Sequence, residues 1–531
     1  MKSKQILSLS LAACLMIGSL AGAGGVQAKA KAKKPVLSKT KMTAYIGKTK
    51  TLKVKKNGTK KIVKTKWTLS GKKVAKLTKK KKTSVTIKGL KKGSATVKAK
   101  VWYQKKGAKK KKKVTLKCKV SVTKYVSPEA KKKANVLNAT TKYQPLAKLA
   151  AQHGFKLGTV VNYTNVTTND NYKNLVKYHF NRLTAGNEFK AYSLLDQAKS
   201  AQSKDGMPVM NYEKADAIIS FAKENGIQMR GHVLVWHAYM CDWFFREGYD
   251  TSKKYVSKAV MQKRLQYYIK EVITHFEKKY PGVIYCWDVV NEAVADNNGE
   301  FAADDVRHVR TVRSGKTNLF YNHIGKDYVE LAFKYAYETR KTLGAEDRIK
   351  LFYNDYNTFM TYGTNKRDAI VELVKSVNSS VSDGQGGHLK LCDGIGMQSY
   401  IGGYGQQSGC MNDNDITAVK NAIEKFASIG VEVHVTELAV RNYERSDERE
   451  AEHGAFYKKL MQTYVDINKE AKAKGETGPI TSLSVWGLFD APYLAETDYS
   501  YKMNGPYCGL FTELYQPKEA FKEVYKVLSG E

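Results

Sequence analysis

The sequence predicts an α/β fold, a (β/α)8 barrel of the TIM type, preceded by a small all-β sandwich. Two observations separate these parts. Residues 1–128 carry 39 lysines, no arginine and no acidic side chain, so of the net charge of +42 only +3 is left for the rest of the chain. From residue 143 onward, apolar runs of strand length alternate with long amphipathic stretches. Since 531 residues exceed one ordinary core, two folding units are expected.

Residues 1–28 have the pattern of a secretory signal peptide. A basic head with Lys2 and Lys4 precedes an apolar stretch of small residues, which ends at Ala28 before a lysine run. We expect cleavage after Ala28, and therefore a secreted protein, extracellular or associated with the cell wall, with no membrane span once mature. A retained membrane anchor and a lipoprotein signal cleaved before Cys14 are the alternatives.

Residues 29–125 predict the all-β unit. Short alternating stretches rich in β-branched residues are separated by Gly and Lys turns, which is typical of antiparallel strands over one small core, and Trp67 is the expected anchor. The strand order and the turn at residues 89–93 resemble the bacterial immunoglobulin-like modules of exported proteins. Its lysine surface would attract anionic cell-wall polymers or acid-substituted glycans, or would be solvated with no specific ligand. Nucleic acid is disfavoured, because the strands lack interleaved aromatic residues.

Residues 126–142 are expected to be a linker, and residues 143–531 the barrel. Eight runs predict buried parallel strands: residues 156–161, 178–183, 228–236, 283–290, 349–353, 394–398, 431–436 and 482–488. Helical patterns lie between most of them, at residues 216–225, 260–279, 328–343, 366–378, 415–429 and 455–474. In such a barrel the carboxyl ends of the strands meet at one rim, which carries the chemistry.

Two of the predicted strands end in glutamate, the fourth at Glu292 and the seventh at Glu437. One rim glutamate alone would more often be solvated or salt-bridged. Two at matching strand ends favour glycosidic cleavage, in which one carboxyl group protonates the leaving oxygen and the other attacks or activates water. This chemistry requires no metal and no cofactor. The cysteines form no zinc-binding pattern, and Cys392 with Cys410 is the one pair worth testing for a disulfide.

Five motifs stand at separate strand ends of the predicted barrel. They read GHVLVWH at residues 231–237, WDVVNEA at 287–293, YNDYN at 353–357, GIGMQS at 394–399 and TEL at 436–438. In this order, from about Tyr143 to the end of the chain, the sequence resembles glycoside hydrolase family 10, the endo-β-1,4-xylanases. The resemblance implies endo-hydrolysis of xylan by a retaining double displacement, with Glu437 as nucleophile and Glu292 as general acid/base.

The resemblance also implies which residues hold the sugar. Asn291 matches the residue that binds the 2-hydroxyl of the sugar under attack, while Trp243 and Tyr356 are further candidates for stacking on a pyranose face. The residues that match the glycone side of the cleft are Asn187, Lys190, His232, Trp236, Gln398 and Trp486. For His232 and Gln398, a buried hydrogen-bonding role would look the same in sequence.

Four positions depart from the family pattern. Gly186 stands where glutamate is common, Tyr400 where a histidine usually contacts the nucleophile, and Ala439 where an acidic residue often follows; Tyr493 is the nearest replacement for a second tryptophan. Distal sugar binding and chain-length preference are therefore open. The alternatives to an endo-xylanase are a related β-glycanase, an exo-acting hydrolase of xylan oligosaccharides, and a non-catalytic surface protein that binds glycans.

Overall fold

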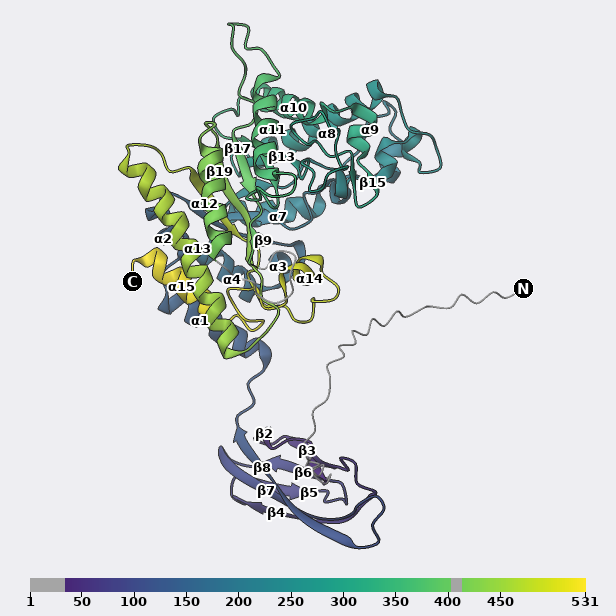
Figure 1. The fold of residues 1–531 in the computed structure, drawn as a ribbon, viewed down its shortest axis with the longest axis vertical. Coiled ribbons are helices and arrows are strands. Elements are labelled where there is room, and N and C mark those ends of the chain that lie inside the picture. Colours follow the sequence, from purple (N-terminus) through teal and green to yellow (C-terminus); the bar gives the residue numbers. More distant parts are fainter. Residues whose placement is uncertain (1–33, 403–412) are drawn as a thin grey trace, which may run out of the picture. The chain divides into compact units, whose positions relative to one another are not determined.

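The computed structural model describes residues 34–402 and 413–531, so the predicted signal peptide and Cys410 lie outside the described residues. The chain divides into two compact units, Met1–Val126 and Ser127–Glu531, each with its own hydrophobic core (Figure 1). The described cysteines are free thiols: Cys118, Cys241, Cys286, Cys392 and Cys508.

The first unit is the predicted all-β sandwich of two four-stranded sheets, ordered β1-β3-β6-β5 and β2-β8-β7-β4. Alternation directs one face of each sheet inward, and Trp67 is buried there, with its indole N–H donating to the Lys81 carbonyl at 2.9 Å. The immunoglobulin-like resemblance stays a prediction. The strands are β1 Val36–Leu37, β2 Lys41–Tyr45, β3 Thr49–Lys55, β4 Lys61–Ser70, β5 Ala75–Thr78, β6 Ser84–Gly89, β7 Gly93–Gln104 and β8 Lys111–Thr123.

The linker expected over residues 126–142 is instead mostly helix α1, Pro128–Lys142. Ser127 caps the helix by accepting from the Ala130 N–H, and a proline opens it. The helix belongs to the second unit, because Val136 is buried in the core of that unit and the Asn135 amide donates to the Leu514 carbonyl at 2.7 Å.

The second unit is the predicted barrel. Eight parallel strands follow one another around it in chain order; β9 pairs with both β10 and β20, and a pairing of β11 with β13 closes the ring. At Gly231 a Cβ would overlap the ring of Trp287, so glycine lets this buried tryptophan fill the barrel. The barrel strands and the short β12 and β18 are β9 Lys156–Val161, β10 Arg182–Ala185, β11 Gln228–Gly231, β12 Val235–Trp236, β13 Ile284–Asn291, β16 Lys350–Asp355, β17 Gly394–Met397, β18 Tyr400–Ile401, β19 Glu432–Val440 and β20 Ile480–Val485.

Two strand predictions need correction. Residues 178–181 were expected in the second strand, but helix α4, Asp170–His179, continues through the first two of them and β10 begins at Arg182. The third predicted strand, residues 228–236, is broken into β11 and β12. At the rim, β10 ends at Ala185, two residues beyond the predicted end, and β12 ends at Trp236 as predicted.

Helices surround the barrel strands (Figure 1). In the described part of the chain no helix combines the length and apolar character needed to cross a bilayer. The helices after α1 are α2 Leu146–Gln152, α3 Tyr163–Thr168, α4 Asp170–His179, α5 Ala191–Leu194, α6 Gln197–Ala201, α7 Glu213–Glu224, α8 Lys258–Lys279, α9 Leu319–Ile324, α10 Tyr328–Thr342, α11 Lys366–Ser379, α12 Asp413–Ala427, α13 Asp447–Ala473, α14 Tyr499–Asn504 and α15 Glu519–Ser529. Three 3-10 turns, η1 His237–Tyr239, η2 Asp242–Phe245 and η3 Glu247–Tyr249, and the hairpin β14 Val312–Arg313 with β15 Lys316–Thr317 lie in the loops.

Candidate active site

Both predicted carboxylates lie at the rim of the barrel. Glu292 directly follows β13, the fourth barrel strand, and Glu437 lies in β19, the seventh. Each side chain is largely buried, with 4% of Glu292 and 5% of Glu437 exposed. Glu292 has a left-handed backbone with φ of 56°, which costs roughly 1–3 kcal/mol in a residue other than glycine. The backbone N–H of Glu292 donates to the Asn354 carbonyl at 2.9 Å, which holds this conformation at the strand end.

A chain of amide side chains joins the two carboxylates. Asn354, on the fifth strand β16, donates from Nδ2 to Glu437 Oε1 at 3.2 Å and to Asn291 Oδ1 at 2.9 Å. Gln398 then donates from Nε2 to Asn291 Oδ1 at 3.3 Å and to Glu292 Oε1 at 3.0 Å. Glu292 and Glu437 are therefore linked across one site by three side chains, although 145 positions separate them in the sequence.

Asn291 has an open donor in this site. Its Oδ1 accepts from two neighbouring amides, but its Nδ2 is buried and has no hydrogen-bond partner among the described residues. A buried donor without a partner is unfavourable unless a ligand meets it. The position suits the 2-hydroxyl contact that the family resemblance implies for Asn291.

Tyr400 and Ala439, two departures from the family pattern, are neighbours. Tyr400 in β18 pairs in register with Ala439 in β19, so their side chains share one face. The small, buried Ala439 leaves room for the phenol, whose hydroxyl donates a short hydrogen bond to Glu437 Oε2. The phenol thus supplies the contact to Glu437 that the histidine would make.

Burial governs the electrostatics around Glu437. Burial raises the pKa of Glu437 above its usual value, and the opposing influence of His232, the Tyr400 hydroxyl and Lys190 offsets this only in part. Burial also raises the pKa of Tyr400 far above its ordinary range, so the phenol stays protonated and remains a donor. Burial lowers the pKa of Lys190, against the attraction of Glu437 and Glu292.

A buried ion network lies beneath the site. Arg230 donates from Nε to Asp288 Oδ2 at 2.8 Å and from Nη1 to His434 Nδ1 at the same distance. His232 Nδ1 lies 2.8 Å from Asp288 Oδ2. Burial alone would raise the pKa of Asp288, but the Arg230 charge and the hydrogen bond with His232 outweigh it and lower the pKa. The network therefore holds the imidazole of His232, which acts electrostatically on Glu437.

The two tryptophans predicted on the glycone side both contact other predicted site residues. The indole N–H of Trp236 donates to Glu292 Oε2 at 3.2 Å, and its ring lies 5.1 Å from Lys190 Nζ. Trp486 packs edge-on to His232 at 6.4 Å between ring centroids, while Lys190 Nζ donates to the exposed Asn187 at 3.1 Å.

This row of rings extends beyond the predicted residues. Tyr239 lies 4.4 Å from Trp236, and Tyr192 lies 5.6 Å from Tyr239, between ring centroids. Both tyrosines are partly exposed, at 37% and 40%. A Cβ at Gly186 would meet Val160 at an ordinary 3.5 Å, so the glycine there is not required by packing.

The other aromatic candidates have different positions. Tyr356 lies beside the site: its hydroxyl donates to Asp296 and its ring lies 5.2 Å from the Arg313 guanidinium, which in turn donates to Glu292 Oε2. Trp243 instead packs against the hydrophobic core, edge-on to Tyr249 at 5.9 Å. Tyr493 is 75% exposed.

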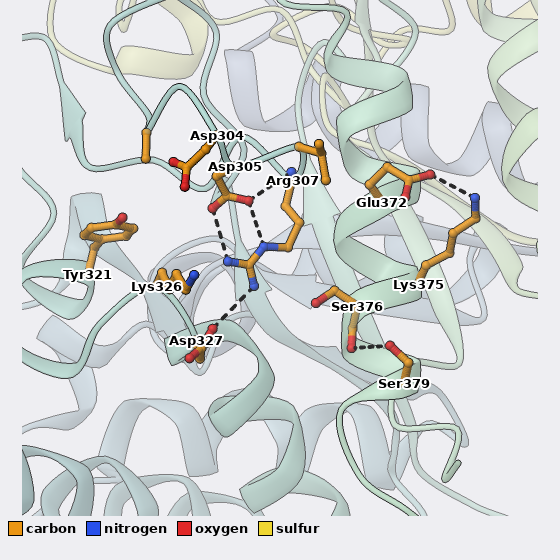
Figure 2. A pocket seen from close by; sticks show the side chains of 12 residues that line it. Asp304, Asp305, Arg307, Tyr321, Lys326, Asp327, Glu372, Lys375, Ser376 and Ser379 are labelled. Atoms are coloured by element: carbon orange, nitrogen blue, oxygen red, sulfur yellow. Dashed lines mark hydrogen bonds and ion pairs between the residues drawn. The ribbon is translucent and has the colours of Figure 1, made fainter. Parts of the chain in front are cut away.

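The loop that carries Arg313 is anchored by a second set of ion pairs. Figure 2 shows Arg307 directed at Asp305 and Asp327 beside a surface hollow of about 650 Å³. Arg307 also pairs with Glu330 of α10, which accepts from Ser376 of α11 at 2.7 Å. None of the predicted site residues lines this hollow. The ion pairs of Arg307 hold the loop after β13 to the helices α10 and α11.

Sequence reasoning missed Asn354, Arg313 and Tyr239. Asn354 had a usable signal, because it stands near a strand end in the YNDYN motif. Arg313 comes from a hairpin in a long loop, and Tyr239 from a 3-10 turn, neither of which the strand-end rule covers. Within residues 34–402 and 413–531, no three His, Cys, Asp or Glu side chains are grouped so as to hold a metal ion.

An eight-stranded β/α barrel with two linked carboxylates at its rim, one directly after the fourth strand and one within the seventh, defines a glycoside hydrolase. The family model described as glycosyl hydrolase family 10 matches residues 145–527. The chain belongs to this family.

Known xylanases are similar to this chain over about two thirds or more of its length. Endo-1,4-beta-xylanase A of Thermotoga maritima is 36% identical over 364 residues, which cover 67% of this chain and 28% of that protein. Endo-1,4-beta-xylanase B of Butyrivibrio fibrisolvens is 32% identical over 398 residues, covering 73% of this chain and 53% of that protein. The solved structure of an intracellular xylanase from Thermoanaerobacterium saccharolyticum is 30% identical with a TM-score of 0.55, covering 72% of this chain and 99% of that one. This chain thus spans only about a quarter to a half of the two sequence relatives.

Proposed function

We propose that the protein is a secreted endo-1,4-β-xylanase that acts by a retaining double displacement, with Glu437 as nucleophile and Glu292 as general acid/base. The observation that carries the proposal is the chain of Gln398, Asn291 and Asn354, which links the two carboxylates across one site. A retaining glycosidase needs two carboxyl groups that face the same scissile bond.

In the first step, a Glu437 oxygen attacks the anomeric carbon of a xylose unit. The bond from that carbon to the leaving sugar oxygen breaks, and Glu292 gives its proton to this oxygen. In the second step Glu292 takes a proton from water, whose oxygen attacks the same carbon and releases Glu437. The anomeric configuration is inverted twice and therefore retained.

The neighbours of the carboxylates support both steps. Tyr400 donates to the Glu437 oxygen Oε2 and so favours the ionised, nucleophilic form. The open Nδ2 donor of Asn291 would bind the 2-hydroxyl of the attacked sugar, while Trp236, Trp486 and Lys190 would hold the glycone. Hydrogen bonds to the 2-hydroxyl that strengthen in the transition state contribute to such reactions.

The test is proton NMR of the first products released from xylan. We expect the β anomer to appear first, from internal cleavage, and neither Glu437→Ala nor Glu292→Ala to match the wild-type rate. An α anomer first, or full activity in Glu437→Ala, contradicts the mechanism. Release of reducing ends from cellulose or mixed-linkage glucan faster than from xylan contradicts the substrate, and binding to xylan without any release contradicts enzymatic function.

Export and wall attachment are part of the proposal. The basic head and apolar stretch of residues 1–28 support secretion, and the lysines of the first unit support attraction to anionic cell-wall polymers. Mass spectrometry of protein from the culture medium should give a chain that begins at Lys29. A lipid-modified chain that begins at Cys14 contradicts this route, and equal wall retention of full-length protein and of residues 126–531 contradicts the attachment.

A further inference from the structure

The outward face of the sheet β2-β8-β7-β4 concentrates lysines. This lysine face consists of Lys64, Lys66, Lys98, Lys100, Lys117 and Lys119, all exposed. Lys66 pairs directly with Lys100, and Lys98 with Lys117, across neighbouring strands. Like charges directly opposite each other are unfavourable in a sheet, and residues 34–126 contain no acidic side chain that could neutralise them. The missing counter-charge must come from outside this unit.

Trp102 adds a second kind of contact to the lysine face. It lies opposite Lys64 and Lys113 on the same face, half-buried, with Lys64 Nζ at 5.9 Å and Lys100 Nζ at 5.7 Å from its ring centroid. The inward neighbours on β7 already fill the sandwich core, so this ring is not needed there. A ring surrounded by ammonium groups can stack on the apolar face of a sugar while the lysines hold its acidic substituents.

The lysine face is also elongated along the direction of the strands. Trp102 stands eight residues beyond Ser94 on β7, which is roughly 27 Å along the strand at the usual rise per residue. Between these ends, lysines share the outward positions with threonines on β7 and on its neighbours β4 and β8. A linear polymer lying along the strands would meet several of these charges and the ring at once.

We infer that the lysine face with Trp102 is a binding site for a uronic-acid-substituted xylan. Charge complementarity requires an anionic polymer, and the tryptophan favours sugar rings over a plain phosphate chain. The unit also has no arginine, the side chain best suited to bidentate phosphate contacts. The choice of xylan rests on the proposed function, whereas the acidic-glycan site itself does not.

The experiment measures retention of the full chain, carrying Glu437→Ala to prevent hydrolysis, on insoluble glucuronoxylan and on the same polymer with its carboxyl groups reduced to alcohols. The cleft contributes equally to every variant. We expect retention about tenfold stronger on the acidic polymer, and K98Q/K100Q/K117Q to lose most of this difference. The matched control K53Q/K55Q/K76Q removes the same charge from exposed lysines of the other sheet and should keep it.

Trp102→Ala should weaken retention on glucuronoxylan about tenfold, and Trp102→Phe should keep most of it, since an aromatic face remains. Circular dichroism checks that both variants fold. Equal losses in the two lysine triples would show general attraction and overturn the site. So would unchanged retention in Trp102→Ala, or binding to polyphosphate that is as strong and independent of Trp102. Xylan hydrolysis by otherwise wild-type chains carrying these changes tests the proposed function separately.

Discussion

The two units of this protein treat charge in opposite ways. The barrel buries ionised groups such as Arg230 and Asp288 and gives each a partner. The sandwich leaves its lysines at the surface, with no acidic side chain of its own to meet them. Buried charges are tolerated only when paired, so their partners fix the geometry above them, whereas surface charges contribute little to folding and remain available to ligands. One unit uses charge to build a site and the other to present a surface.

The largest expected effect is on catalysis. Glu437→Ala should lower kcat/KM on soluble xylan oligosaccharides by about 10⁴-fold or more, because the nucleophile is lost. The sandwich control K53Q/K55Q/K76Q should leave this rate unchanged. Initial rates of reducing-sugar release measure both variants. A comparable loss of activity in the control would contradict the assignment of catalysis to the barrel alone.

The next largest effect is expected on folding stability at acidic pH, where the barrel and the sandwich should respond differently. Burial lowers the pKa of His179 and His434 to about 4 and that of His453 to about 3. The unfolded chain, in which histidine titrates near 6.5, therefore binds more protons below neutrality, and barrel stability falls by several kcal/mol as pH drops from about 6.5 to 4. Asp490 opposes this, since burial raises its pKa to about 6.

The sandwich has neither histidine nor acid in residues 34–126, so its stability should stay level over the same interval. Calorimetry of the full chain at pH 7 and pH 4 measures this, with one transition expected for each core. A barrel transition that does not move would contradict the buried histidine argument.

Substitutions in ion pairs test the difference between buried and exposed charges. Arg230→Met should destabilise the barrel by about 3–5 kcal/mol, because Asp288 would be left buried without its main counter-charge. Arg445→Met breaks a pair with Glu513 in which the two side chains are 43% and 32% exposed, and should cost only about 1 kcal/mol or less. Urea unfolding of the two variants gives the comparison, and equal costs would refute it.

Tyr400→Phe should have a smaller, pH-dependent effect. The lost hydrogen bond favoured ionised Glu437, so its pKa should rise further and the acid limb of the kcat/KM profile should move to higher pH. The rate at the optimum should fall about tenfold. A uniform loss at every pH, without movement of the acid limb, would reduce Tyr400 to a packing role.

The smallest effect is expected on the surface of the sandwich. K98Q/K100Q/K117Q should change the free energy of unfolding of that unit by no more than about 0.5 kcal/mol per residue, and in the stabilising direction, because the repulsion between facing lysines is removed. Thermal unfolding at low salt is the measurement. A large destabilisation would show that these lysines hold the sandwich together.

The barrel and its reacting pair were predictable because both follow from period and position: apolar runs specify parallel strands, and strand ends specify the rim. Two of the errors lie where a capped helix occupies part of a segment that was assigned to another structure. Asn169 caps the start of α4 through the Tyr172 N–H, and this helix ends at His179, inside the segment expected to be a strand. Ser127 with Pro128 starts a helix inside the lysine-rich stretch expected to be a linker.

The site was predictable at strand ends and not in loops. Gln398 and Asn291 were found from their motifs, whereas Arg313 reaches Glu292 from a long loop that the ion pairs of Arg307 and Arg310 hold in place. A contact that depends on ion pairs between distant elements leaves no periodic trace in the sequence. The lysines were evident from composition, but which of them share a face with Trp102 depends on strand register.

The registered pair of Tyr400 and Ala439 constrains how this enzyme could have diverged or could be redesigned. Imidazole alone at position 400 would lack the acidic neighbour that usually accompanies it, and a carboxylate alone at position 439 would be buried against the phenol without a counter-charge. Either half-way state is therefore expected to be less stable than a matched pair. Protein engineers who graft the common arrangement onto this scaffold should exchange both positions in a single step.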